Sequence, residues 1–145
     1  MRYELAYQLK KDFPSLLIAV NGGIKTNKEI AQHLQHADGV MVGREAYYNP
    51  WLLGSWDAAF YSDAHEVPSR EVVEEAMVTY MERAFAEDGC PWYAIARHML
   101  GLYHGQRGGR LWRQGWSDPK LKPLPPREVW QLARAALARG AVVTD

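Results

Sequence analysis

Two glycine-containing turns have the residue types of a phosphate-binding site. Asn21, Gly22 and Gly23 follow one short apolar run, and Gly43 and Arg44 follow a second. Glycine lets backbone amides approach a ligand closely, and a guanidinium pairs well with phosphate. One such turn alone is more often just a tight connection between a strand and a helix. Two turns together, with an arginine at the second, favour phosphate binding.

A second pair of residues either contacts a polyanion or belongs to a solvated helix face, which can carry the same charge. Residues 97–139 carry nine Lys and Arg against two acidic residues, although the whole chain has a net charge of zero. Arg110 and Arg113 are three positions apart, so on a helix they share one face and can reach neighbouring phosphates. Lys120 and Lys122 add positive charge nearby. Trp112 could stack on a base, but packing in the core is the expected role of this side chain.

Other chemistry is weakly supported by the residues. The single cysteine, Cys90, has no partner for a disulfide and no metal-binding spacing, and it is expected to serve as a small residue at a helix start. His33 and His36 could share a helix face, but without a third ligand nearby they are expected to be packing or surface residues. No metal site, nucleophilic triad or carboxylate pair is recognised. No apolar run approaches the roughly 20 residues of a membrane span, and a cytoplasmic location is expected.

The elements that must position the two turns form an α/β pattern. A helix is predicted over residues 3–12, and buried strands over 16–20 and 39–42. Thr26 and Glu29 form a capping box for a helix between the strands. The order predicts a βαβ unit with parallel strands. Neither strand alternates polar and apolar residues, so each needs cover on both faces, which the few strands of this chain are not expected to provide.

After Pro50 the pattern becomes helical. Ser69 caps a helix over 69–87, Pro91 opens another, and a last helix runs over 127–139 and is expected to stop at Gly140. The apolar stripe of the helix 69–87 is predicted to comprise Val72, Val73, Ala76, Met77, Tyr80, Met81, Ala84 and Phe85. The expected organisation is an α/β part over 1–54, a linker over 55–66 and a small helical bundle over 67–145.

Several segments together resemble the tRNA-dihydrouridine synthases, and most closely their A subgroup. The barrel segments that carry the resemblance are Val20-Asn21-Gly22-Gly23-Ile24-Lys25-Thr26, His33-Leu34-Gln35-His36, Asp38 to Tyr47 and Asn49-Pro50. Arg97-His98-Met99-Leu100-Gly101-Leu102 and Arg110-Leu111-Trp112-Arg113 resemble the helical tail of that subgroup. The resemblance covers roughly residues 2 to 118.

The resemblance implies a fold and a function. The chain would be the end of a TIM (β/α)8 barrel, contributing its last two strands, followed by a helical tRNA-binding domain. The family reduces uridine in the tRNA D-loop (20/20a) to 5,6-dihydrouridine, using NADPH and bound FMN. Matching motif positions imply that the FMN phosphate is held by Asn21, Gly22, Gly23, Gly43 and Arg44. They imply that tRNA is contacted by Arg110 and Arg113.

Departures from the family pattern set further expectations. The loop cysteine that donates the proton has no counterpart here, and Cys90 does not match it, so no catalytic residue is assigned. Gln106 and Arg107 stand where the subgroup usually has a proline. The chain is therefore expected to be a C-terminal portion that is inactive alone. Two alternatives are a tRNA-binding remnant without catalysis and the end of another phosphate-binding barrel enzyme.

Overall fold

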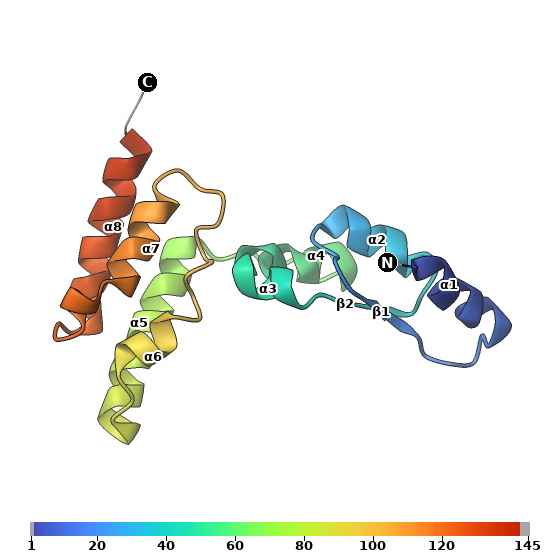
Figure 1. Cartoon of the computed structure of the whole chain (residues 1–145), viewed down its shortest axis with the longest axis horizontal. Helices are drawn as coiled ribbons and strands as arrows, with labels where there is room; N and C mark the ends of the chain where they lie inside the picture. Colours follow the sequence, from blue (N-terminus) through green and yellow to red (C-terminus); the bar gives the residue numbers. More distant parts are fainter. Residues whose placement is uncertain (1, 143–145) are drawn as a thin grey trace.

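The computed structural model describes residues 2–142 and consists mostly of helices with one small parallel sheet. Figure 1 shows an elongated chain, with β1, β2, α1 and α2 at one end and α5 to α8 at the other. Helices α3 and α4 lie between the two ends (Figure 1). In chain order the elements are α1 (Tyr3–Asp12), β1 (Ala19–Asn21), α2 (Asn27–Leu34), β2 (Gly39–Met41), α3 (Arg44–Tyr48), η1 (Pro50–Ser55), α4 (Trp56–Phe60), α5 (Arg70–Asp88), α6 (Trp92–Ala96), α7 (Gly109–Ser117), η2 (Pro119–Leu121) and α8 (Pro126–Val142).

The βαβ unit is confirmed. Strands β1 and β2 pair in parallel, with Val20 opposite Val40. Helix α2 connects them and begins with the predicted capping box, in which the Thr26 hydroxyl accepts from the Glu29 amide and the Glu29 carboxylate accepts from the Thr26 amide. This reciprocal pairing satisfies amides that have no partner inside the helix. The two strands therefore end at the same edge of the sheet.

The two strands are only partly covered, as expected for a chain with too few strands to cover both sheet faces. Strand β1 begins only at Ala19, and of its three residues only Val20 is buried. Leu16 and Leu17 precede the strand, and the side chain of Leu17 is 91% exposed. A two-stranded sheet offers too little surface for both faces to be buried, which explains the incomplete cover.

A small apolar core supports this end of the molecule. Val20, Ile24, Ile30 and Ala37 are buried together. Packed against them are partly buried side chains from α1, β2 and α4, namely Tyr3, Ala6, Tyr7, Val40, Val42, Trp56 and Phe60. Helix α4 falls within the range 55–66 that was expected to be a linker, yet its aromatic side chains belong to this core. The division into domains stays a prediction, and its limits at 1 and 145 lie outside the described residues.

The helical end has a larger core. It comprises Val78, Met81, Trp92, Ala96, Met99, Leu102, Trp112, Trp116, Val129 and Ala133. The predicted stripe of α5 is partly wrong, because Val72, Tyr80 and Phe85 are exposed whereas Glu74 and Val78 are fully buried. The face of α5 that packs against α6 and α8 thus includes a glutamate, Glu74.

Helix α8 continues past Gly140, so the predicted stop at this glycine is wrong. Gly140 instead packs against α7. A Cβ atom at Gly140 would lie 2.7 Å from the Cα of Gly108 and 3.0 Å from a methyl group of Leu111. Close packing of α7 on α8, rather than helix termination, accounts for glycine at this position.

The loop between α6 and α7 packs against the end of α3. A Cβ atom at Gly101 would overlap the backbone carbonyl of Tyr48, at the end of α3. The Tyr47 hydroxyl lies 3.0 Å from Nδ1 of His98. These contacts fix α3 against the loop 97–108.

Within residues 2–142, no helix combines the length and apolar character that crossing a bilayer requires.

Candidate functional site

The two predicted turns line one cavity of about 560 Å³, which we call the glycine cavity. Parallel pairing of β1 and β2 places both turns at the same edge of the sheet. The lining residues are Asn21, Gly22, Gly23, Ile24, Lys25, Met41, Gly43, Arg44, Glu45 and Tyr48. The structure therefore brings all five residues of the predicted phosphate site together, and what they bind stays a prediction.

The backbone of the first turn requires glycine. Gly22 and Gly23 have φ angles of 117° and 71°, in the region that other residues rarely adopt. At the second turn, a Cβ atom at Gly43 would meet nothing within 4 Å, so this residue leaves open space beside the cavity. A ligand oxygen can thus approach the main chain at both turns.

Charge in the glycine cavity comes from side chains. The Arg44 guanidinium forms no hydrogen bond or ion pair with residues 2–142 and is exposed. Lys25, which was not assigned a role from the sequence, adds a second cation. Glu45 is the one acidic residue in the lining, and its carboxylate lies 3.4 Å from the side-chain amide of Asn49. Because α3 has only five residues, we attribute the attraction for an anion to Arg44 and Lys25 rather than to a helix dipole.

Helix α1 holds the first turn in place. The Tyr3 hydroxyl donates a hydrogen bond to the Gly22 carbonyl. The Tyr3 ring packs on His33, with ring centroids 4.4 Å apart, and the Tyr7 hydroxyl is hydrogen-bonded to Nδ1 of His33. His33 is buried, so the packing role expected for it is confirmed, and His36 stacks on Tyr7 at the surface. Sequence reasoning missed Tyr3, whose role depends on a contact between distant parts of the chain.

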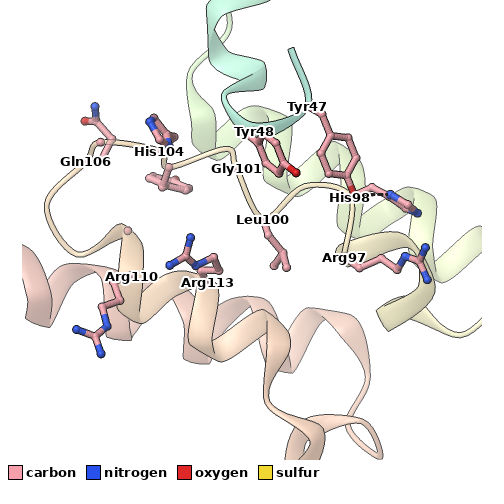
Figure 2. Close-up of a pocket in the computed structure, with 13 residues that line it drawn as sticks. Tyr47, Tyr48, Arg97, His98, Leu100, Gly101, His104, Gln106, Arg110 and Arg113 are labelled. Atoms are coloured by element: carbon pink, nitrogen blue, oxygen red, sulfur yellow. Dashed lines mark hydrogen bonds between the residues drawn. The ribbon is translucent and has the colours of Figure 1, made fainter. Parts of the chain in front are cut away.

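Arg110 and Arg113 line a second cavity of about 640 Å³, which we call the arginine cavity. Both residues lie on α7 and are exposed. Figure 2 shows the cavity between α7, the loop 97–108 and the end of α3. Its lining residues are Tyr47, Tyr48, Arg97, His98, Leu100, Gly101, Tyr103, His104, Gly105, Gln106, Gly109, Arg110 and Arg113.

A buried carboxylate fixes α7 behind this cavity. Glu74 of α5 accepts hydrogen bonds from Trp112 Nε1 at 2.5 Å and from the Tyr103 hydroxyl at 2.9 Å. Arg134 of α8 lies 3.5 Å from the same carboxylate. Trp112 is completely buried, which confirms the predicted core role. Burial, followed by the charge of Glu74 and the hydrogen bond to it, raises the pKa of Tyr103.

The remaining predicted residues lie away from the linings of the two cavities. Cys90 precedes α6 and is partly buried, at the helix start where it was expected. Lys122 lies 4.6 Å from the Tyr93 ring centre, and Lys120 is exposed on η2. In the part of the chain that the structure describes, no three His, Cys, Asp or Glu side chains are grouped so that they could hold a metal ion.

The fold and the two cavities define a class of protein. A parallel βαβ unit with an arginine and glycine turns at its carboxyl edge is typical of α/β proteins that bind phosphorylated ligands. A cationic helical part adjoins that edge here. Residues 1–133 match the dihydrouridine synthase family, and the chain belongs to this family. Membership also implies a TIM barrel, with which the parallel strands are consistent.

Relatives of the chain carry more specific names. It is 45% identical over 136 residues to a tRNA-dihydrouridine(20/20a) synthase of Synechocystis sp. and 44% identical over 135 residues to that of Vibrio vulnificus. It is 46% identical over 131 residues to that of Shewanella oneidensis. These matches cover 94%, 93% and 90% of the chain but only 40%, 41% and 39% of the respective relatives. The chain thus spans about 40% of the length of the relatives it matches.

Proposed function

We propose that the chain forms the phosphate-binding edge and the tRNA-binding part of a tRNA-dihydrouridine synthase. The full-length protein would reduce uridine at position 20/20a of the tRNA D-loop, with NADPH as the reductant and FMN as the cofactor. The observation that carries the proposal is the convergence of Asn21, Gly22, Gly23, Gly43 and Arg44 on one cavity. Membership in the dihydrouridine synthase family favours this function over that of another phosphate-binding barrel.

The residues of the glycine cavity fit the phosphate of FMN. Backbone amides at the left-handed Gly22 and Gly23 offer hydrogen bonds, and Gly43 leaves room for phosphate oxygens. Arg44 supplies a guanidinium that forms no ion pair with a described carboxylate. The bound flavin supplies hydride transfer to the uracil ring. The chain's own contribution is to hold the phosphate and so fix the position of the cofactor.

The apolar surface of the sheet suits a barrel that continues beyond β1 and β2. Leu17, just before β1, and Met41, the last residue of β2, are exposed, at 91% and 53%. Further strands and helices of the full-length protein would cover such side chains, as both faces of parallel sheets are normally covered. The proton donor would also come from that part, since Cys90 lies outside the linings of both cavities.

The arginine cavity is the proposed contact with tRNA. Arg110 and Arg113 are three residues apart on α7, so they lie on the same side of the helix, and both line the cavity. Guanidinium groups on an exposed helix can pair with backbone phosphates, which positions an RNA without reading its sequence. The reactive uridine would then be presented toward the glycine cavity.

Binding measurements on the chain test both halves of this proposal. FMN is titrated by fluorescence, and Arg44→Ala is expected to weaken its binding about tenfold or more, because a charge-assisted hydrogen bond is lost. Lys28→Ala on the exposed face of α2 is the matched control and is expected to leave FMN affinity unchanged. Unaltered FMN affinity in Arg44→Ala would overturn the cofactor assignment.

The tRNA half is tested separately with unmodified tRNA. Arg110→Ala and Arg113→Ala are each expected to weaken binding and to flatten its salt dependence. Binding of tRNA without any Arg44-dependent binding of FMN would favour the alternative of a tRNA-binding remnant. Absence of salt-dependent tRNA binding by the parent chain would overturn the tRNA assignment.

A further inference from the structure

The arginine cavity carries more positive charge than Arg110 and Arg113 alone provide. Arg97 also lines it, and none of its thirteen lining residues is acidic. The guanidinium groups of Arg97, Arg110 and Arg113 form no hydrogen bond or ion pair with residues 2–142. Three arginines without counter-charges in one lining indicate a site for an anionic partner.

The arrangement of these arginines suits an extended polyanion. In Figure 2, the Arg113 side chain points toward the loop that carries Gly101 and His104. Arg97 and Arg110 lie at opposite margins of the cavity, on either side of Arg113 (Figure 2). A single phosphate is best held by guanidiniums that converge on it, whereas a nucleic-acid strand presents phosphates in succession. The cavity therefore favours a strand over a small phosphorylated molecule.

Two of the three tyrosines in the lining, both from α3, give the cavity an aromatic wall. Tyr47 is held by its hydrogen bond to His98, with the two rings edge-on at 5.9 Å. Tyr48 is 60% exposed and lines both the arginine cavity and the glycine cavity. An exposed aromatic ring offers a stacking surface to an unpaired base. The position of Tyr48 makes the two cavities neighbours along α3.

We propose that the arginine cavity binds a single-stranded segment of tRNA, with Arg97 as a third phosphate contact and Tyr48 as a stacking platform. The inference rests on the proposed function and adds residues to it. A strand bound along Arg110, Arg113 and Arg97 passes the Tyr48 ring, at the border of the glycine cavity. Tyr48 thereby positions the nucleotide that enters the flavin site.

The first test measures tRNA binding by the chain over a range of salt concentrations. Arg97→Ala is expected to weaken binding about fivefold near 0.1 M salt. The negative slope of log K against log salt is expected to become shallower by about 0.7 to 0.9, the value for one lost phosphate contact. Arg83→Ala is the matched control, because Arg83 is an exposed arginine of α5 whose described contact is with the Tyr80 ring. It is expected to change neither quantity.

The second test concerns stacking. Tyr48→Leu is expected to weaken tRNA binding about tenfold with an unchanged salt slope, because a ring but no charge is lost. Tyr48→Phe keeps the ring and is expected to bind like the parent. Circular dichroism of each variant checks that α3 and the helical end remain folded.

The outcomes separate this inference from the proposed function. If Arg110→Ala and Arg113→Ala weaken tRNA binding but Arg97→Ala and Tyr48→Leu do not, the additional contacts are overturned and the proposed function stands. Loss of NADPH affinity in Arg97→Ala, with tRNA affinity retained, would identify the cavity as a dinucleotide site and overturn the inference. Equal effects of Tyr48→Leu and Tyr48→Phe would rule out stacking.

Discussion

Removal of the Glu74 carboxylate tests how the proposed tRNA-binding helix is held in place. Glu74 is fully buried and bonds both Trp112 of α7 and Tyr103 of the preceding loop. Trp112 lies between Arg110 and Arg113 along α7. We predict that Glu74→Ala destabilises the chain and also weakens tRNA binding, because α7 loses the contact that fixes its rotation.

The structure gives the expected magnitude. In Glu74→Ala the Trp112 N–H is left in a completely buried position without its acceptor, at a cost of about 1–3 kcal/mol. The Arg134 guanidinium loses a carboxylate 3.5 Å away, and the shortened side chain leaves a cavity. Arg134 is partly exposed and keeps its closer ion pair with Glu71 at 2.9 Å, so the unpaired Trp112 N–H and the cavity dominate, for a total loss of about 3–5 kcal/mol. Glu74→Gln keeps the shape and one acceptor, so a loss of about 1–2 kcal/mol is expected.

Urea denaturation followed by circular dichroism measures the free energies of unfolding, and salt titration of tRNA binding provides the second readout. Glu75→Ala is the control, since this neighbouring glutamate is exposed and its loss is expected to change stability by no more than about 0.5 kcal/mol. The reasoning would be refuted if the free energy of unfolding of Glu74→Ala were within about 1 kcal/mol of that of the parent. It would also be refuted if Glu74→Gln were as destabilised as Glu74→Ala.

Three further predictions concern other parts of the chain. Gly101→Ala places a methyl group against the Tyr48 carbonyl and 3.0 Å from Pro50 Cδ. The free energy of unfolding in urea is therefore expected to fall by about 1–3 kcal/mol. Unchanged stability would contradict the close approach of Gly101 to Tyr48. Thr26→Ala removes the N-cap of α2 and should cost about 1 kcal/mol by the same assay, with Thr26→Ser as the control that retains the hydroxyl. Folding raises the pKa of Tyr103 above its unfolded value near 10, so its stabilising contribution is complete below pH 10 and declines as pH rises above it. The parent should therefore lose stability more steeply than Tyr103→Phe in denaturation measured above pH 10, and parallel pH profiles would refute this.

The features that the sequence predicted well depend on local chemistry. The capping box of Thr26 and Glu29 and the N-cap Ser69 both satisfy amides within three residues along the chain. The βαβ order also follows from local patterns, since a parallel pair needs a crossover between its strands. For the same reason the glycine turns could be expected at one sheet edge, where the structure places them.

The features that the sequence predicted poorly depend on contacts between distant residues. Glu74 is assigned no role in the core from the sequence, because its partners Trp112 and Tyr103 are about 30 to 40 positions away. Its spacing with Val78 and Met81 on one helix face was the available signal. Gly140 resembled a helix stop, yet only the packing of α8 on α7 shows why glycine is needed there.

The two ends of the chain differ in how fully they support the sites they carry. The arginine cavity is backed by a core of ten buried residues, two of which are tryptophans of α7. The glycine cavity is backed by four, and β1 and β2 have three residues each. A pair of such short strands is marginally stable unless other elements pack on it. Here that support comes from α1 through Tyr3, and from the fit of Gly101 against the end of α3. The order of the proposed phosphate site thus depends partly on the helical end, through the same α3 residues that border the proposed tRNA strand.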